Sequence, residues 1–287
     1  MYPEGYCPET KFEKLLLAID CTVFSEGAVR EAINLAKQCS SFLYILTVLD
    51  FNQAYKLLGE DFRNKKEQEA KDCLESVKIM AGAEGISLET ILCRDENPAK
   101  CILDEAARKK VSLIIIGRHG HTAVERDILG SVTSAVIPKA PCNVLVAAVG
   151  TRIEFKNMMV ATDGSEHAQA AVLEAFKIAQ STGSHLLVVS VAPSKRKTVE
   201  AEKIVADIAA MAEKAGVTVE TLIPAGNPYK VITDIGHKRL VDLIVMGTFG
   251  KAGFRYLVMG STTEKVIESA HCAVLVVNTP EQRSRNS

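Results

Sequence analysis

The sequence contains no tryptophan, and aromatic residues make up only 5% of its 287 residues. This composition disfavours a stacking platform for single-stranded nucleic acid, which requires exposed aromatic rings. An excess of basic charge is also missing: the formal net charge is -1. That balance argues against a nucleic-acid binder working through a broad basic field.

Long apolar runs are absent as well. Runs such as residues 113–116 and 274–277 are far below the roughly 20 residues that a helix needs to cross a bilayer. The first twelve residues are polar, include two prolines and lack the apolar stretch of a secretory signal. We therefore expect a cytoplasmic protein that does not span a membrane.

None of the eight cysteines forms a C-x-x-C pair. A chain of this size does not depend on a disulfide framework, and no zinc-binding spacing is present. We expect small buried thiols in a reducing cytosol. The cysteines are Cys7, Cys21, Cys39, Cys73, Cys93, Cys101, Cys142 and Cys272.

Two common nucleotide-binding motifs are missing. There is no G-x-x-x-x-G-K-[ST] P-loop, and no G-x-G-x-x-G follows the first apolar run of either half of the chain. The sequence therefore disfavours a P-loop NTPase and a dinucleotide-dependent oxidoreductase.

The two halves of the chain repeat one pattern. The segment ending at Asp20 (LLLAID) aligns with the segment ending at Asp163 (MMVATD), 143 residues later. Farther along, Gly117 aligns with Gly247 at a spacing of 130, so the second half is shorter. A period of this length indicates duplication of a whole domain and excludes a solenoid. We predict domains at residues 1–150 and 151–287.

Apolar runs alternate with stretches of helical periodicity in each half. Residues 15–19 form a continuous apolar run, as expected for a strand buried on both faces. The other predicted strands are 42–49, 86–92, 113–116 and 144–149, and in the second half 158–162, 185–191, 217–223, 243–246 and 273–277. This alternation predicts an α/β fold of parallel strands with right-handed crossovers. In such sheets ligands bind beyond the carboxyl ends of the strands.

Helices are predicted over residues 26–38 and 65–83, and from Pro98 onward with Asn97 as its N-cap. The first half also carries an insertion near residues 51–66. Its apolar side chains allow two interpretations: an amphipathic helix that contacts a partner or the other half, or a lid packed on its own domain.

A glycine-spaced loop follows the fourth predicted strand of each half. It reads Gly117-Arg-His-Gly120, nine residues, then Gly130-Ser131, and in the second half Gly247-Thr-Phe-Gly250, nine residues, then Gly260-Ser261. The first glycine lets the backbone approach a ligand, and a helix starting at the last glycine points free N–H groups at the same place. A single G-x-x-G is an ordinary turn, but its recurrence at the same place favours phosphate binding.

Polar side chains accompany both loops and can contact a phosphate. The hydroxyl donors are Ser131, Thr133, Ser261 and Thr263. The charged or titratable residues are Arg118, His119, His121, Arg126, Lys251 and Arg255.

Asp20 and Asp163 end the first strand of each half. Such a carboxylate can accept hydrogen bonds from a ribose or an adenine amino group. Alternatively, each aspartate caps the next helix together with Thr22 or Ser165. Neither has a second carboxylate at a spacing typical of a metal site or an acid–base pair.

These features together resemble the universal stress protein family, over almost the whole chain and as two tandem domains. The resemblance rests on both G-x-x-G-x9-G-S loops, on Asp20 and Asp163, and on the segments ending at Cys142 and Cys272 before the last strands. It implies a five-stranded parallel sheet between helices in each domain, a Rossmann-like fold of the adenine-nucleotide α-hydrolase-like type. It also implies antiparallel pairing of the last strands across a pseudo-two-fold axis, which would cover an apolar edge.

The resemblance implies an adenine nucleotide as ligand, ATP or AMP, with or without Mg²⁺. The base-binding positions that it implies are Asp20 with Val48, and Asp163 with Val191. The phosphate-binding positions are Gly117, His119, Gly120, Gly130, Ser131, Val132 and Thr133 in the first half, and Gly247, Gly250, Gly260, Ser261, Thr262 and Thr263 in the second.

Two positions depart from the family pattern. Cys21 replaces the glycine that usually follows the first-strand aspartate, which the second half keeps as Gly164. A side chain there would crowd the base. Phe249 stands where the first half has His119, which removes a polar contact to phosphate. We expect the two sites to differ in affinity or occupancy.

The leading hypothesis is a non-enzymatic regulator of the stress response, in which nucleotide orders the loop 118–129 for a partner or a second chain. A slow ATPase or adenylyl-transfer enzyme is the alternative, with His119 or His121 as base. A third hypothesis is an interaction module that binds no nucleotide. The expected partners are the nucleotide, the other half of the chain and a second copy, with neither nucleic acid nor membrane.

Overall fold

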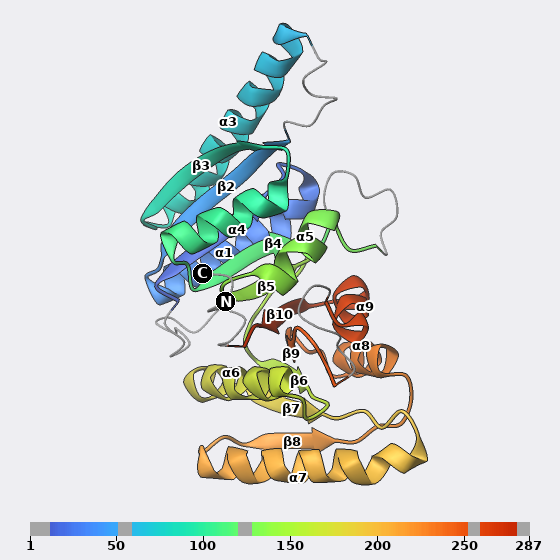
Figure 1. Cartoon of the computed structure of the whole chain (residues 1–287). Helices are drawn as coiled ribbons and strands as arrows, with labels where there is room; N and C mark the ends of the chain where they lie inside the picture. Colours follow the sequence, from blue (N-terminus) through green and yellow to red (C-terminus); the bar gives the residue numbers. More distant parts are fainter. Residues whose placement is uncertain (1–11, 51–58, 120–127, 252–258, 280–287) are drawn as a thin grey trace.

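The structure is a computed structural model that describes residues 12–50, 59–119, 128–251 and 259–279. These residues form a ten-stranded sheet with strand order β3-β2-β1-β4-β5-β10-β9-β6-β7-β8 (Figure 1). The first five positions belong to the first half of the chain and the last five to the second. The two halves therefore lie side by side along one sheet, and the predicted α/β fold is confirmed.

The first half builds five strands and four helices within the described residues. Its strands are β1 (Lys14–Ile19), β2 (Phe42–Asp50), β3 (Leu88–Asp95), β4 (Leu113–Gly117) and β5 (Asn143–Ala147). Its helices are α1 (Glu26–Cys39), α3 (Glu60–Ala83), α4 (Pro98–Lys109) and α5 (Ser131–Val136), with short 3-10 helices η1 (Val23–Ser25) and η2 (Ile137–Lys139).

The second half repeats this order. Its strands are β6 (Asn157–Ala161), β7 (His185–Val189), β8 (Val219–Leu222), β9 (Leu243–Gly247) and β10 (Ala273–Val277). Its helices are α6 (Glu166–Thr182), α7 (Thr198–Lys214), α8 (Pro228–Lys238) and α9 (Ser261–Ser269), with the 3-10 helix η3 (Lys195–Lys197).

Neighbouring strands within each half run parallel, as predicted. The central strands β4 and β9 are buried along their whole length, which accounts for their uninterrupted apolar runs. Three predicted strands are shorter in the structure, and one of them, β7, ends at Val189 and not at residue 191. β5 ends at Ala147, and the exposed Val149 beyond it is no longer paired in the sheet. β8 covers only Val219–Leu222 of the predicted 217–223.

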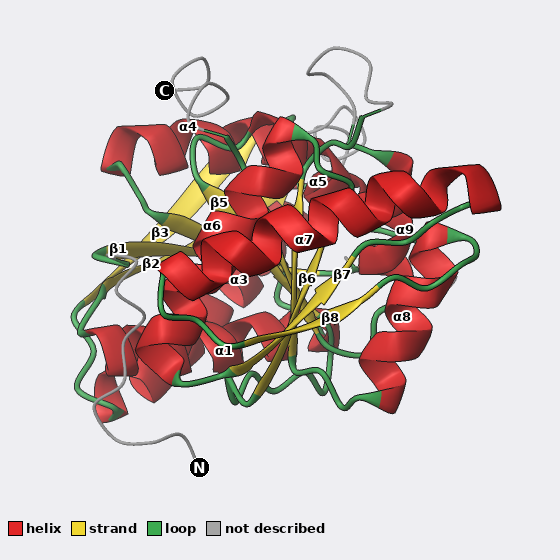
Figure 2. Ribbon diagram, turned by 90° about the horizontal axis from the view of Figure 1, so that it is seen from below, coloured by secondary structure: helices red, strands yellow, loops and turns green. Residues whose placement is uncertain are grey.

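Two hydrophobic cores lie on opposite faces of the sheet, and helices cover both faces (Figure 2). One core packs α1, α3, α6 and α7 against the strands, and the other packs α4, α5, α8 and α9. Each core draws side chains from both halves of the chain. The halves therefore share their interior.

The junction between the halves is the antiparallel pair of β5 and β10. Val146, Leu145 and Val144 lie opposite Val274, Leu275 and Val276, respectively. This confirms the pairing of the last strands within one chain. Because both edges are paired here, neither apolar strand is left open to another molecule.

Helix α3 begins at Glu60, five residues before its predicted start, and its first turns project past the sheet (Figure 1). Phe62 is exposed in this projection. The rest of the predicted insertion, residues 51–58, lies outside the described residues. None of the described helices is long and apolar enough to cross a bilayer.

The cysteine prediction was wrong for the first half of the chain. Cys21 is bonded to Cys73 and Cys93 to Cys101, and Cys39 is also disulfide-bonded. Spacing along the chain could not show this, because the partners are 52 and 8 residues apart and meet only when helices pack on strands. Cys142 and Cys272 are buried thiols, as predicted.

Candidate functional site

In each half, the chain adds strands on one side of its first strand and then on the other. The candidate site lies at this change, between β1 and β4 or between β6 and β9. β1 pairs with β4 in parallel, with Ala18 opposite Ile116, so the loops that follow these strands leave the sheet at the same edge. β6 and β9 form the same arrangement, with Val160 opposite Val245. A reversal of this kind opens a crevice beyond the carboxyl ends, which is where ligands bind in parallel sheets.

The glycine-spaced loop closes on itself in the same way in both halves. The Gly130 N–H donates to the Arg118 carbonyl at 2.9 Å, and the Gly260 N–H donates to the Thr248 carbonyl at 3.0 Å. Each bond brings the start of α5 or α9 back to the end of the preceding strand. Free N–H groups at these helix starts are the donors on which the predicted phosphate sites depend.

A buried threonine fastens each loop to its strand. The Thr133 hydroxyl donates to the Gly117 carbonyl at 2.8 Å, and the Thr263 hydroxyl donates to the Gly247 carbonyl at 2.9 Å. The sequence suggested these hydroxyls as phosphate donors, but in the structure their protons are used inside the loop. The serine at the start of each helix is exposed and is therefore the hydroxyl available to a ligand.

The strand-ending glycines are required by packing. A Cβ atom at Gly117 would lie 2.9 Å from the Phe24 carbonyl oxygen, and one at Gly247 would lie 2.6 Å from the carbonyl group of His167. Sequence analysis attributed this small size to the approach of a ligand. In the structure, η1 and the first turn of α6 fill that space, so these glycines pack the glycine-spaced loop against the segment that follows β1 or β6.

Aromatic rings pair across the two loops, with their identities exchanged between the halves. Phe24 meets His119 edge to face, with ring centroids 6.0 Å apart, and His167 meets Phe249 in the same way at 5.0 Å. Phe24 and His167 occupy equivalent positions, as do His119 and Phe249. Phe249 is therefore a buried packing partner of His167, which accounts for the loss of a histidine there.

Asp20 organises the turn that follows β1. Its Oδ1 accepts hydrogen bonds from the Thr22 N–H at 3.1 Å, from the Thr22 hydroxyl at 2.8 Å and from the Ser25 hydroxyl at 2.7 Å. These contacts belong to the capping role that sequence analysis held open, because Thr22 is the N-cap of η1. A role toward a ribose or a base stays a prediction.

Asp163 links the equivalent turn to the glycine-spaced loop of the second half. Its Oδ1 accepts from the Ser165 N–H at 3.0 Å, and its Oδ2 accepts from the Lys251 N–H at 2.7 Å. A Cβ atom at Gly250 would lie 2.6 Å from the same Oδ2. Gly250 therefore permits the carboxylate of Asp163 to reach the loop.

Comparison with known proteins agrees with this duplicated architecture. The model of the universal stress protein family matches the chain twice, over residues 11–148 and 154–278. The chain belongs to the universal stress protein family. Its two halves are tandem copies of the family's domain.

Individual relatives match one repeat at a time. A universal stress protein of Methanocaldococcus jannaschii is 33% identical over 144 residues, which is 45% of this chain and 85% of that protein. The Bacillus subtilis universal stress protein YxiE is 34% identical over 146 residues, covering 47% of this chain and 98% of that protein. The crystal structure of a universal stress protein from Archaeoglobus fulgidus shares the fold with a TM-score of 0.75, at 23% identity over 93% of this chain and 99% of that chain.

The remaining predicted positions of the universal stress protein repeats lie at or beyond the second strand of each repeat, or outside the described residues. Val48 is half-buried in β2, opposite Cys93 of β3. Val191 is half-buried just beyond the end of β7. Gly120 lies outside the described residues.

Arg118 does not point toward the candidate phosphate position. Its guanidinium donates to the Glu268 carbonyl at 3.2 Å and to the Ala270 carbonyl, and so caps the end of α9 in the other repeat. Burial lowers the pKa of Arg118. No sequence signal could have shown this role, because Arg118 and its acceptors are 150 and 152 residues apart.

Lys251 is the described cation nearest the glycines of the second loop, and it is already paired. Its ammonium lies 2.5 Å from the Glu200 carboxylate of α7, which also contacts Lys197 at 2.7 Å. These two cations lower the pKa of Glu200 to about 2. The pairing links the second loop to α7 at the surface, a contact that sequence analysis missed.

Proposed function

We propose that this universal stress protein binds an adenine nucleotide, ATP or AMP, at the sheet edge of each repeat and acts as a regulatory protein of the stress response. The observation that carries the proposal is the closed glycine-spaced loop, built twice with the same internal hydrogen bonds. Each copy sets the start of a helix beside the crevice where strand order reverses. This arrangement suits a phosphate group flanked by a nucleoside.

In the proposed complexes the base lies against the end of β1 or β6 and the phosphates lie on the glycine-spaced loop. The base-side residues are Asp20 and Val48 in the first repeat, and Asp163 and Val191 in the second. The phosphate-side residues are Gly117, His119, Gly120, Gly130, Ser131, Val132 and Thr133, and Gly247, Gly250, Gly260, Ser261, Thr262 and Thr263. Thr133 and Thr263 contribute backbone N–H groups, since their hydroxyls bind glycine carbonyls.

Magnesium would enter these sites bound to the phosphates of the nucleotide. Among the described residues, no group of three His, Cys, Asp or Glu side chains is placed to hold a metal ion. Phosphate oxygens are the usual ligands of Mg²⁺ in nucleotide sites. We therefore propose Mg²⁺ as a companion of ATP with no protein carboxylate cluster of its own.

The proposal favours binding over hydrolysis. His119 is the described histidine on the first loop, and its Nδ1 lies 2.8 Å from the Ile128 carbonyl. A carbonyl can only accept, so this contact requires a proton on Nδ1 and leaves Nε2 as the sole basic nitrogen of the ring. The Ile128 carbonyl and the Phe24 ring hold the imidazole, so hydrolysis with Nε2 of His119 as the base is the alternative that a phosphate-release measurement would reveal.

The proposal is tested by denaturing the purified protein and counting the released nucleotide by chromatography and mass spectrometry. Two adenine nucleotides per chain, or binding of added ATP with Mg²⁺ by calorimetry, is the expected result. Phosphate release above the blank would favour the slow ATPase instead. No released nucleotide and no calorimetric binding would leave the interaction module as the function.

Replacing the glycine at the helix start of each loop by valine tests the two sites one at a time. Gly130→Val is expected to remove one nucleotide per chain, because the added side chain blocks the approach of a phosphate to the backbone. Gly260→Val is the matched variant and should remove the other. An unchanged count in both variants, with folded protein by circular dichroism, would refute the placement of the phosphates.

A further inference from the structure

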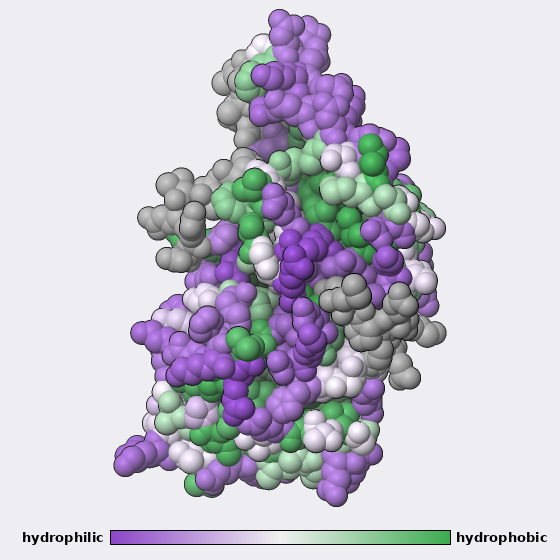
Figure 3. Space-filling view, turned by 180° about the vertical axis from the view of Figure 1, so that it is seen from behind, coloured by the Kyte–Doolittle hydropathy of each residue, from purple (hydrophilic) through white to green (hydrophobic). Residues whose placement is uncertain are grey.

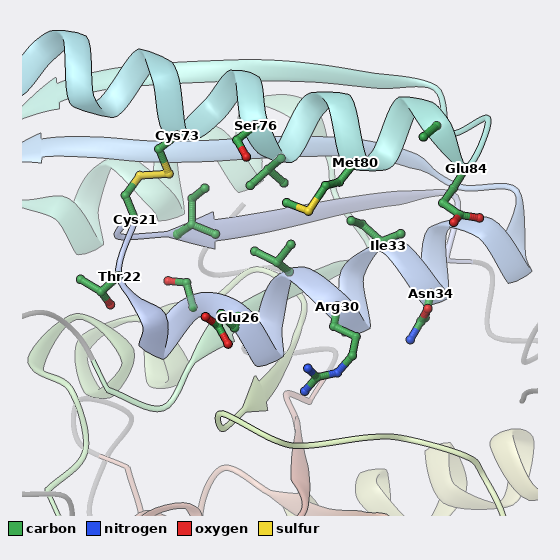
Figure 4. Close-up of a pocket in the computed structure, with 15 residues that line it drawn as sticks. Cys21, Thr22, Glu26, Arg30, Ile33, Asn34, Cys73, Ser76, Met80 and Glu84 are labelled. Atoms are coloured by element: carbon green, nitrogen blue, oxygen red, sulfur yellow. A yellow bond between two sulfur atoms is a disulfide. The ribbon is translucent and has the colours of Figure 1, made fainter.

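Cys21 and Cys73 join the turn of the first candidate site to helix α3. Cys21 follows Asp20 directly, and Cys73 lies in the middle of α3, 52 residues later. Their Cα atoms are 5.9 Å apart and their sulfur atoms are bonded (Figure 4). The turn that carries Asp20 is thereby tethered to the neighbouring helix.

The second repeat shows that the fold itself places these two positions together. Gly164 is the equivalent of Cys21, and Ile204 of α7 is the equivalent of Cys73. A Cβ atom at Gly164 would lie 2.9 Å from the Cδ1 and Cγ1 atoms of Ile204. The same two positions are adjacent in both repeats, and only the first repeat occupies them with cysteines.

The Cys21–Cys73 pair is open to solvent. Cys21 is exposed, and both cysteines line a groove of about 650 Å³ between α1 and α3 (Figure 4). The upper half of the molecule, seen from behind, shows hydrophobic side chains gathered in a hollow (Figure 3). A small thiol or disulfide can therefore reach these sulfur atoms, as exchange requires.

The other described cysteines are half-buried or buried, and Cys39 and Cys93 are half-buried as Cys73 is. Cys101, the partner of Cys93, is buried. Cys142 and Cys272 are buried as well, and burial raises the pKa of Cys272 to about 12. A thiol with so high a pKa holds almost no nucleophilic thiolate at neutral pH. Among the described cysteines, Cys21 is thus the one that is exposed, and Cys73 is bonded to it.

The bond also bears on the conformation of the turn. Cys21 has a φ of 62°, in the left-handed region that residues other than glycine rarely adopt. Gly164 has a φ of 75° at the equivalent position, where glycine adopts this conformation readily. With the bond present, Cys21 is held in the glycine-like conformation. Reduction removes this restraint and leaves the hydrogen bonds of Asp20 to hold the turn.

We propose that Cys21 and Cys73 form a reversible thiol–disulfide exchange site whose partners are small disulfides and thiols of the glutathione class, and that its redox state sets the order of the turn 20–25. The consequence for the nucleotide rests on the proposed function: reduction weakens binding at the first site and leaves the second unchanged.

The small disulfide is the oxidant in this exchange, and it is reduced to two thiols. The thiolate of Cys21 attacks one sulfur of the small disulfide and expels one thiolate. Cys73 then attacks the mixed disulfide and expels the second. Two protein thiols become one disulfide, one small disulfide becomes two thiols, and the two protons pass from the cysteines to the products.

The exchange site is tested on the full chain in glutathione buffers of stepped ratio. Samples are quenched, alkylated with two mass-tagged reagents before and after reduction, and analysed by mass spectrometry. The expected result is that Cys21 and Cys73 exchange together and at least tenfold faster than Cys93 and Cys101. Exchange of both pairs at the same rate, or a Cys21–Cys73 pair that does not form, would overturn the proposal.

The link to the turn is tested by amide hydrogen exchange, which needs no nucleotide. Reduction should speed exchange in residues 20–25 and leave the turn at 163–165 unchanged as an internal control. Cys21→Gly should keep the turn protected under both conditions, because glycine adopts the required φ without the bond. Cys21→Ser should leave the turn unprotected under both. Equal protection in all three proteins would overturn the conformational part.

Nucleotide titration distinguishes this inference from the proposed function. In the Gly260→Val variant only the first site remains, and reduction is expected to raise its Kd about tenfold, the factor that corresponds to releasing one left-handed residue. An unchanged Kd would overturn the link to the nucleotide. Redox-dependent exchange in the turn without any nucleotide binding would sink the proposed function and leave the exchange site standing.

Discussion

Gly247 ends β9 packed directly against the backbone of α6. A Cβ atom at this position would lie 2.6 Å from both the carbonyl carbon and the carbonyl oxygen of His167. Backbone atoms cannot swing away as a side-chain end can. At the residue scale, the strand-ending glycine is therefore a requirement of the fold before it serves any ligand.

Gly247→Ala is expected to destabilise the protein by about 1–3 kcal/mol, the usual cost of overpacking a filled interior. Urea unfolding monitored by circular dichroism measures the change. Gly82→Ala in α3 is the matched control, because nothing lies within 4 Å of its added Cβ. That variant should stay within about 0.5 kcal/mol of the parent. Equal midpoints for the two variants would contradict the packing role.

Helices α4 and α8 are equivalent elements that begin with the same Asn-Pro pair. Asn97 accepts a hydrogen bond from the Lys100 N–H at 3.1 Å and so caps α4. Asn227 stands at the N-cap of α8 without a side-chain capping bond. The same Asn-Pro pair therefore begins one helix with a side-chain capping bond and one without it. Comparing the two helices measures how much this bond contributes to stability.

Asn97→Ala should cost about 1 kcal/mol, because it leaves an N–H group at the start of α4 without its acceptor. Asn227→Ala should cost less than half as much, because no such bond is lost there. Thermal unfolding of both variants beside the parent measures the difference. A larger loss in Asn227→Ala than in Asn97→Ala would show that the cap of α4 carries little stability.

The two repeats are joined at the scale of the whole molecule by buried polar groups as well as by β5 and β10. Asn278, which follows β10, donates from Nδ2 to the carbonyls of Ile137 at 3.2 Å, Ala140 at 3.0 Å and Cys142 at 3.0 Å in the first repeat. Its own N–H donates to Asn143 at 3.2 Å. One amide therefore closes the end of the α5–η2 segment of the other repeat.

Asn278→Ala is expected to lower stability by about 2–3 kcal/mol, because buried carbonyl groups lose their donor. The measurement is the free energy of unfolding in urea. Asn157→Ala is a suitable control, since its exposed amide reaches the Leu240 carbonyl only at 3.4 Å. Similar losses in both variants would indicate that the junction rests on strand pairing and apolar packing alone.

The sequence by itself determined the duplication, the alternation of strands and helices, and the places where ligand-facing loops begin. Uninterrupted apolar runs predicted β4 and β9 because a strand buried on both faces has no polar side. Asn97 predicted the start of α4 because capping depends only on neighbouring residues. Periodicity, caps and glycine spacing are local properties, so they can be read from the chain without its partners.

Only the tertiary structure decided which distant groups meet. Cys21 and Cys73 are far apart in sequence and become bonded because α3 packs beside the end of β1. The sequence also did not predict that His119 and Phe249 exchange places in the two ring pairs. Nor did it predict that Arg118 caps α9. Each of these contacts depends on how elements pack across the sheet. That packing is set by the sum of many weak interactions over the whole chain and leaves no mark on the spacing of the residues involved.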